Sequence, residues 1–196
     1  MNILNLLTNK QYKQLIIKEY KQDDILFKEN EKCESIGILL EGRLSIQSYL
    51  EDGSIVIYNI INKGDMFGNN LIYSSSPYYK GFVICQSDAK VAYINKTQLT
   101  NLLKSNDEFL LNYLNINSNF SKKLNDRIKL LSISNAKDRL MYYFHVNNNE
   151  IAYTSITALA NELYLQRETL SRLINKLGKE NIITKNKNKI ELLWGK

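Results

Sequence analysis

Apolar and polar residues follow three different patterns along this chain, and each pattern predicts a different kind of element. From Tyr20 to Ile94 the apolar residues form short runs divided by turns, which is typical of β-strands. From Asn106 to Ser134 they recur at alternating steps of four and three residues, the spacing of a heptad seam on a long helix. From Gln166 to Gly178 they follow the period of an amphipathic helix. We therefore expect an α+β fold.

Glycines set the turns of the β-rich part. Gly42, Gly53 and Gly64 follow one another at intervals of eleven residues. Glycine adopts the positive φ of tight turns without steric cost, so this interval predicts strand reversals in a small antiparallel β-roll of jelly-roll type. The strands expected around these turns are residues 36–40, 44–46, 55–61, 83–85 and 91–94.

The amphipathic helix has one face for packing and one that suits recognition. At roughly 100° per residue, the packing face carries Leu170, Leu173, Ile174 and Leu177. The opposite face carries Arg167, Glu168, Ser171, Arg172 and Asn175. Such side chains read base edges in a DNA major groove, although the same charges also simply solvate many exposed helices. Gly178 is expected to cap the C-terminal end of the helix.

The segments on either side of this helix complete a winged helix-turn-helix. Ser155 is expected to cap a short helix that ends near Leu163, and Tyr164–Gln166 has the length of the turn in such motifs. After the amphipathic helix, the apolar runs 181–185 and 190–194 flank a polar, lysine-bearing turn. That pattern predicts a β-hairpin, the wing, beside the helix.

The segment from Ser155 to Ile183 resembles the winged helix-turn-helix of the CRP/FNR family of bacterial transcription regulators, above all in Arg167-Glu168-Thr169 and Ser171-Arg172. The resemblance implies that the two arginines contact guanine and that Glu168 contacts cytosine, in TGTGA-like half-sites of a palindromic operator. The chemistry agrees, because a guanidinium fits guanine O6 and N7 and a carboxylate accepts from cytosine N4. The expected DNA-binding residues are Gln166, Arg167, Glu168, Thr169, Ser171, Arg172, Lys185 and Lys187.

Two positions depart from the family pattern. Tyr164 replaces the usual glycine of the turn, where a left-handed backbone would cost about 1 to 2 kcal/mol. Gln166 replaces the usual serine at the N-cap of the reading helix, which weakens the cap.

A second resemblance lies in the β-rich part, where Gly64-Asp65-Met66-Phe67-Gly68 is similar to the G-D-x-x-G of cyclic-nucleotide-binding folds. In relatives that respond to cyclic AMP, a glutamate and an arginine followed by a small residue hold the ribose and the phosphate. The matching positions here are Asn69, Tyr79 and Lys80, which offer neither a carboxylate nor an arginine fork, so cyclic AMP control is not expected.

Two interpretations of Tyr79 and Lys80 stay open. Either Tyr78, Tyr79 and Lys80 belong to a solvated loop after Pro77, or Lys80 contacts a different anionic ligand. In the family, polar residues of the long helix also reach the adenine, and the matching positions are Leu124 and Asn125. The candidate effector-binding residues are therefore Asn69, Tyr79, Lys80, Leu124 and Asn125.

The heptad seam of the long helix runs through Leu110, Leu114, Asn117, Ser121, Leu124, Ile128 and Leu131. It could pack back on the β-roll, but its spacing fits better a parallel pairing with a second copy of the chain, as family members make. Asn117 and Ser121 would then fix the register. The expected dimerisation residues are Leu110, Leu114, Asn117, Leu124, Ile128 and Leu131.

Composition and residue counts limit the partners, the localisation and the cofactors that we expect for this protein. The 196 residues carry a formal charge of +6, which suits a polyanionic partner. The N-terminus lacks a signal peptide and no apolar run approaches the length of a membrane span, so we expect a cytoplasmic protein without a membrane partner. Cys33 and Cys85 are too few for an iron–sulfur cluster and too far apart in the sequence to suggest a thiolate metal site. Related haem sensors use an axial histidine in the sensor domain, whereas the single histidine here, His145, lies in the expected DNA-binding part, so haem is not expected. No catalytic constellation stands out, so no enzyme is expected.

The sequence thus predicts three domains: a sensor β-roll (1–106), a dimerisation helix (107–134) and a winged helix-turn-helix (135–196), with a hinge at Ser134–Asn135. The predicted function is a homodimeric, nucleotide-independent CRP/FNR-type regulator without a cofactor, whose partners are double-stranded DNA and RNA polymerase. The alternative is a sensor module of the same fold with a non-nucleotide ligand or a redox trigger at Cys33 or Cys85.

Overall fold

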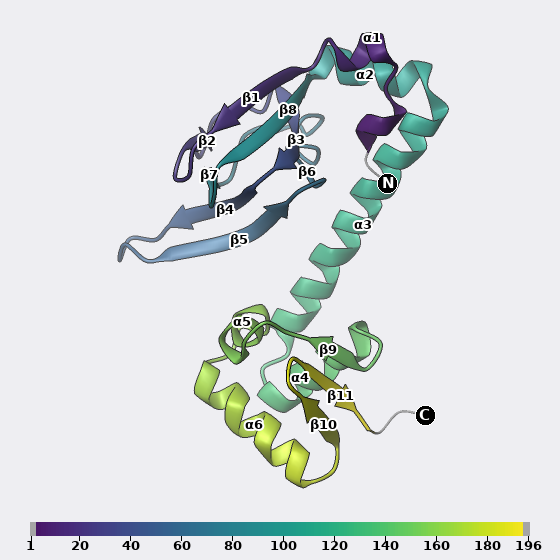
Figure 1. Ribbon diagram of the computed structural model, residues 1–196. Coiled ribbons are helices and arrows are strands. Elements are labelled where there is room, and N and C mark those ends of the chain that lie inside the picture. The colour runs from purple at the N-terminus through teal and green to yellow at the C-terminus, as the bar shows by residue number, and fades with distance from the viewer. Residues whose placement is uncertain (1–2, 194–196) are drawn as a thin grey trace. The chain divides into compact units, whose positions relative to one another are not determined.

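The computed structural model describes residues 3–193, and its contacts divide the chain into two compact units, residues 1–118 and 119–196. The division falls within the long helix α3 (Asp107–Ser132), so each unit contains part of that helix. The α+β class and the order of β-roll, long helix and winged helix-turn-helix are confirmed (Figure 1).

The first unit is the predicted antiparallel β-roll. Two four-stranded sheets, β1-β8-β3-β6 and β2-β7-β4-β5, form it, and α2 leads from the last strand into α3 (Figure 1). Its elements are η1 (Ile3–Leu6), α1 (Asn9–Tyr12), β1 (Ile16–Tyr20), β2 (Ile25–Phe27), β3 (Ser35–Glu41), β4 (Arg43–Tyr49), β5 (Ile55–Asn62), β6 (Met66–Phe67), β7 (Phe82–Cys85), β8 (Ala89–Asn95) and α2 (Lys96–Ser105).

Apolar side chains from both sheets make one core. Ile36, Leu39, Leu44, Val83 and Val91 are fully buried there, and they come from four different strands. Phe109 and Tyr113 of α3 join the same core, which attaches the first turns of the long helix to the β-roll.

The three predicted turn glycines have the expected positive φ, but they lie in different kinds of connection between strands. Gly42, Gly53 and Gly64 all have positive φ, between 80° and 91°. Only Gly53 closes a hairpin, because β4 pairs with β5, whereas Gly42 and Gly64 each carry the chain from one sheet to the other. At Gly42 a Cβ atom would lie 2.2 Å from the Asp88 carbonyl oxygen, so glycine is needed there for space as well as for conformation.

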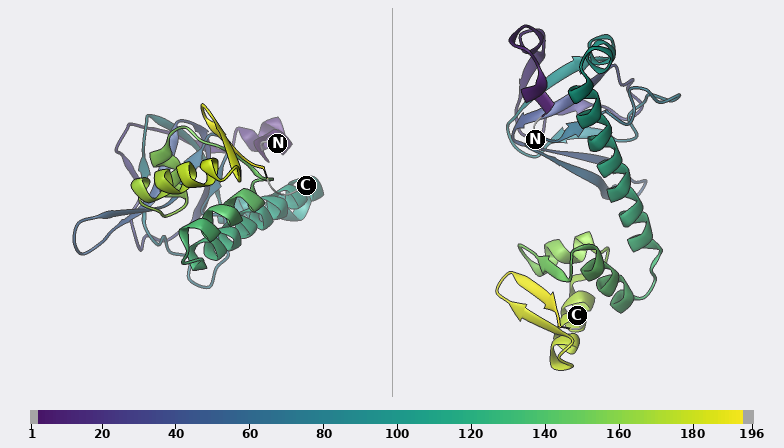
Figure 2. Two further views of the ribbon diagram at one scale, coloured as in Figure 1. Left: turned by 90° about the horizontal axis from the view of Figure 1, so that it is seen from below. Right: turned by 90° about the vertical axis from the view of Figure 1, so that its right-hand side faces the viewer.

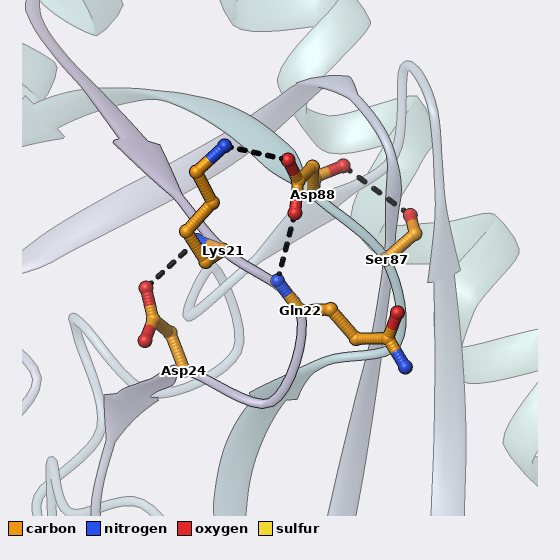
Figure 3. Close-up of polar contacts among 5 residues, drawn as sticks. All are labelled: Lys21, Gln22, Asp24, Ser87 and Asp88. Atoms are coloured by element: carbon orange, nitrogen blue, oxygen red, sulfur yellow. Dashed lines mark hydrogen bonds and ion pairs between the residues drawn. The ribbon is translucent and has the colours of Figure 1, made fainter.

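The Asp88 turn is also held from the other side by the β1–β2 loop (Figure 3). The Asp88 carboxylate accepts hydrogen bonds from Lys21 Nζ at 2.8 Å and from the Gln22 backbone N–H at 3.0 Å. The Lys21 backbone N–H in turn donates to Asp24 at 2.7 Å. Lys21 holds the pKa of the Asp88 carboxyl below its usual range, but both side chains are exposed, so the pair adds little stability.

The second unit contains the remainder of α3, three shorter helices and a small sheet with the order β10-β11-β9 (Figures 1 and 2). Its elements are α4 (Ala136–Val146), β9 (Glu150–Ala152), α5 (Ile156–Glu162), α6 (Arg167–Lys179), β10 (Ile183–Asn186) and β11 (Lys189–Leu192). Asn135 caps α4, since its side chain accepts from the backbone N–H groups of Lys137 and Asp138.

One local prediction in this unit is wrong. Gly178 does not cap α6, because the helix continues to Lys179 and the left-handed residue that follows is Asn181, with φ 53°. The short strand β9, which pairs with β11, is an element that the sequence analysis did not predict. The wing is confirmed as β10 and β11, while Trp194, expected at its end, lies outside the described residues.

Candidate functional site

The helix-turn-helix is fixed by its own core. Ser155 caps α5 as predicted, accepting from the Ala158 backbone N–H at 3.0 Å. The backbone N–H of Leu165, in the turn, donates to the Ala160 carbonyl oxygen at 2.9 Å. The apolar side chains on the facing sides of α5 and α6 are buried together: Leu159, Ala160, Leu163, Leu170, Ile174 and Leu177. This packing decides which face of α6 points to solvent.

The two departures from the family pattern have the predicted consequences. Tyr164 adopts the left-handed conformation, with φ 52°. Gln166 occupies the N-cap of α6 but makes no side-chain hydrogen bond to cap it. The turn is therefore kept despite a bulky residue in a strained backbone conformation.

The polar face of α6, here termed the reading face, is open to solvent. Gln166, Arg167, Glu168 and Arg172 are exposed, whereas Thr169 and Ser171 are half-buried. Arg167 Nη1 lies 3.6 Å from Glu168 Oε1, so these two groups pair weakly with each other. Arg172 makes no hydrogen bond or ion pair with any of residues 3–193 and is available to a ligand.

The wing adds cations beside α6. Lys185 on β10 and Lys187 in the turn are both exposed. Lys189 differs, because its Nζ lies 2.8 Å from a Glu150 carboxylate oxygen and 2.6 Å from one of Glu191. Those two carboxylates raise the pKa of Lys189 above its ordinary value and offset its charge locally. The cations left for a polyanion on the wing are thus Lys185 and Lys187.

In the first unit, Asn69 is bonded to the long helix. The Asn69 side-chain amide donates to Asn117 Oδ1 at 3.0 Å. The Asn69 backbone carbonyl oxygen accepts from the Tyr113 hydroxyl at 3.1 Å. Asn69 is a candidate effector residue and Asn117 a candidate dimerisation residue, so the structure brings together two predictions made independently. Tyr113 was missed, since an aromatic residue beside a heptad seam gives no signal of a polar role.

Tyr79 lies in the core of the β-roll, which corrects the interpretation of this residue as part of a solvated loop. Its side chain is only 2% exposed, and its ring stacks on Phe27 with the centroids 4.5 Å apart. Its hydroxyl finds no well-oriented hydrogen-bond partner within residues 3–193, although the Cys33 thiol is near. Burial raises the pKa of Tyr79 far above its usual range. Lys80, the next residue, is exposed.

The predicted dimer seam is only partly covered. Within the first unit, Leu110 is half-buried, Leu114 is 51% exposed, and Asn117 is turned toward Asn69. Within the second unit, Leu124, Ile128 and Leu131 are exposed, as is Asn125. Leu111, which was not predicted, is also exposed. An exposed row of large apolar side chains on a helix is typical of a surface that another chain covers.

Within residues 3–193, no three His, Cys, Asp or Glu side chains come close enough together to hold a metal ion. No helix in that range combines the length and the apolar character that crossing a lipid bilayer requires.

Comparisons with known proteins agree with this architecture. Residues 17–106 match the family described as "Cyclic nucleotide-binding domain". The anaerobic regulatory protein of Bacillus subtilis is 22% identical over 178 residues, covering 85% of this chain and 75% of that protein.

Two solved structures are similar over nearly the whole chain. A CooA mutant from Carboxydothermus hydrogenoformans has a TM-score of 0.71 at 20% identity and covers 98% of this chain and 91% of its own. CprK in complex with OCPA has a TM-score of 0.70 at 16% identity, covering 98% and 89%. Residues 17–106 thus match a cyclic nucleotide-binding domain, and the fold and domain order of the whole chain are similar to those of these solved structures.

Proposed function

We propose that this protein is a homodimer that binds a palindromic operator of two TGTGA-like half-sites. The observation that carries the proposal is the reading face, where Arg167, Glu168 and Arg172 are exposed on a helix whose other face is locked in a core. A guanidinium and a carboxylate at these positions offer the donor and acceptor pattern that guanine and cytosine require in the major groove. Lys185 and Lys187 on the wing supply contacts to phosphate.

The dimer follows from the geometry of duplex DNA. Each chain has one reading helix, and two half-sites in successive major grooves lie about 34 to 36 Å apart. A second copy must therefore be held at a fixed spacing. The exposed residues Leu114, Leu124, Ile128 and Leu131 on α3 are the surface we assign to that contact. RNA polymerase is the further partner that a transcription regulator of this type is expected to contact.

We propose that cyclic AMP does not control the protein. The position that would bind the phosphate is occupied by a buried aromatic ring, Tyr79, and the position that would bind the ribose is an amide, Asn69, already bonded to Asn117. Haem and iron–sulfur cofactors are not proposed either, since the single histidine, His145, lies on α4 outside the β-roll and two cysteines are too few for a cluster.

A second candidate function is a sensor for a non-nucleotide ligand, and the Asn69–Asn117 hydrogen bond favours it. A ligand that competes for the Asn69 amide would act directly on the helix that carries the proposed dimer contact. Two proteins of similar structure are a CO-dependent CooA and a c-di-GMP-responsive regulator, so proteins of this fold respond to chemically different molecules.

The test is a binding measurement on the full-length chain. Its affinity for a duplex with two inverted TGTGA half-sites is compared with that for a scrambled duplex of equal length, by fluorescence anisotropy at fixed salt. We expect the operator to bind about a thousandfold more tightly, the chain to be dimeric by light scattering, and cyclic AMP to change neither result. Equal affinity for both duplexes, or a monomeric chain, would rule out the proposal.

A further inference from the structure

The turn of the helix-turn-helix contains a strained residue whose side chain has a partner. Tyr164 has φ 52°, a conformation that disfavours any residue with a Cβ atom. Glycine would remove that strain, so the tyrosine side chain must contribute something that offsets it. Its ring is 41% exposed and therefore does not fill the core.

The partner of the ring is an arginine of α3. The guanidinium carbon of Arg127 lies 5.1 Å from the centroid of the Tyr164 ring, within the range of a cation–π interaction. Burial lowers the pKa of Arg127, which indicates that the charge is partly removed from water. A cation–π contact strengthens when its cation is desolvated.

The backbone of the same turn is held by a second arginine. Arg139 Nη1 donates to the carbonyl oxygens of Leu163 at 3.2 Å and Tyr164 at 3.0 Å. Its Nε donates to the Ile133 carbonyl oxygen, just after the end of α3, at 2.9 Å. The turn is thus attached to the end of α3 through its backbone by Arg139 and through its side chain by Arg127.

Arg127 lies on the side of α3 that packs on the winged helix-turn-helix. Leu130, three residues later and on the same helix face, is 5% exposed and belongs to the core of the second unit. Ile128, the next residue, is 61% exposed and belongs to the proposed dimer seam. Leu124 and Leu131 of the seam lie three residues before and four residues after Arg127, so Arg127 borders the dimer surface on one side and the buried Leu130 on the other.

We propose that Arg127 and Tyr164 are positioning residues, which set the angle of the reading helix α6 relative to the dimer seam of α3. Neither residue needs to touch DNA. By fixing that angle in each chain, the pair determines which half-site spacing the dimer accepts. The inference rests on the proposed function, since it presupposes a dimer that reads two half-sites.

The experiment measures affinity as a function of half-site spacing. Operators with the optimal spacer, and with spacers one and two base pairs longer or shorter, are titrated with wild type and with the variants Tyr164→Gly, Tyr164→Phe and Arg127→Gln. Thermal unfolding of each protein is recorded in parallel. Arg43→Gln, an exposed arginine of the first unit, serves as the control for loss of one positive charge.

We expect Tyr164→Gly to weaken binding to the optimal operator roughly three- to tenfold, the size of a partly desolvated cation–π contact. Binding to the other spacers should change little, so the spacing profile flattens, while the melting temperature stays equal or rises because the backbone strain is gone. Arg127→Gln should flatten the profile equally, and the double variant should show no further loss. Tyr164→Phe, which keeps the ring, should match wild type.

Two results would overturn the inference alone: a Tyr164→Gly variant with the wild-type spacing profile, or one whose affinity for every duplex falls in step with a lowered melting temperature. The second result would mean that the residues act on stability only. A wild-type chain that fails to prefer the operator to a scrambled duplex would instead overturn the proposed function, and the inference with it.

Discussion

The reading face of α6 and the matching sensor positions of the β-roll hold their side chains in opposite ways. On α6, Arg172 is exposed and makes no bond to any residue in the described range 3–193, and Arg167 makes only a long contact to its neighbour. In the β-roll, Tyr79 is stacked in the core and Asn69 is bonded to Asn117. A side chain without a strong partner in the free protein can pair with a ligand without first breaking an internal contact. By this criterion the proposed DNA-binding face is open to a ligand, whereas the positions that match the nucleotide site are part of the protein's own packing.

Replacing Tyr79 by arginine tests this difference between the two sites, and it has the largest expected effect. The substitution restores the residue type that holds a phosphate in related sensors, but it places an unpaired guanidinium among Phe27, Phe67 and Tyr93. We expect a loss of about 3 to 5 kcal/mol of unfolding free energy, measured by urea denaturation, and no gain of cyclic AMP binding by calorimetry.

Tyr79→Phe is the matched control for this change. It keeps the ring and removes only a buried hydroxyl without a well-oriented partner in residues 3–193, so stability should be unchanged or slightly higher. A Tyr79→Arg protein as stable as wild type that binds cyclic AMP would show that the site is still a nucleotide pocket.

Arg172→Ala tests the other half of the contrast. Since Arg172 has no partner to lose within the described residues, the substitution should leave stability within about 0.5 kcal/mol of wild type. It should cost about 1 to 3 kcal/mol of operator binding and relax the preference for one base pair in each half-site. Anisotropy titrations against single-base operator variants measure both effects.

Arg43→Ala removes the same charge from an exposed position outside the reading face and controls for long-range electrostatics. If both substitutions weaken operator and scrambled DNA alike, Arg172 contributes charge and not base recognition.

How far the sequence predicts this molecule depends on how local each feature is. The caps Ser155 and Asn135, the left-handed Tyr164 and the positive φ of Gly53 are each determined within a few residues, and all were predictable. The burial of Tyr79 was not, because its loop has a polar composition and its stacking partner Phe27 lies far away in the sequence.

The same reasoning explains the heptad seam. Spacing alone identifies the row of residues on α3, and it treats Asn117 like its neighbours. Only the three-dimensional structure shows that this side chain is used inside the first unit, by Asn69. The short strand β9 was missed for a similar reason, since its three residues gain strand character only by pairing with β11.

Asn117→Leu separates the two roles of this residue. As a seam position it should strengthen the dimer when made apolar, but as the acceptor for a buried Asn69 amide it should destabilise the β-roll. We expect the second effect, about 1 to 2 kcal/mol of unfolding free energy, because an unsatisfied buried donor carries that cost. Sedimentation and denaturation of the same samples report both quantities, with Ser121→Leu, an exposed seam position, as the control. A variant that forms a tighter dimer and keeps the wild-type stability would show that Asn117 acts in the dimer seam.

Lys187→Ala should have a smaller and less specific effect. A lysine that contacts phosphate releases about one counterion, so the slope of log affinity against log salt should fall by about 0.9 for each Lys187 that reaches the DNA. Operator and scrambled duplex should be weakened in the same proportion. Lys189→Ala, whose charge is already offset by Glu150 and Glu191, should change the slope less. Equal changes of the salt slope in the Lys187→Ala and Lys189→Ala variants would argue against the proposed contact between Lys187 and phosphate.

The smallest effect is expected at the thiols, and it decides between the proposed function and a redox trigger. Burial raises the pKa of Cys85 to about 11 and also raises that of Cys33. At pH 8 about one Cys85 thiol in a thousand is then ionised, and only the thiolate reacts. Native protein should accordingly react with a disulfide reagent far more slowly than protein in guanidinium, where both thiols titrate, and the native rate should rise as pH approaches 11. Rapid modification of either thiol at pH 8, together with a change in operator affinity that a reductant reverses, would favour a redox trigger at Cys33 or Cys85 over the proposed function.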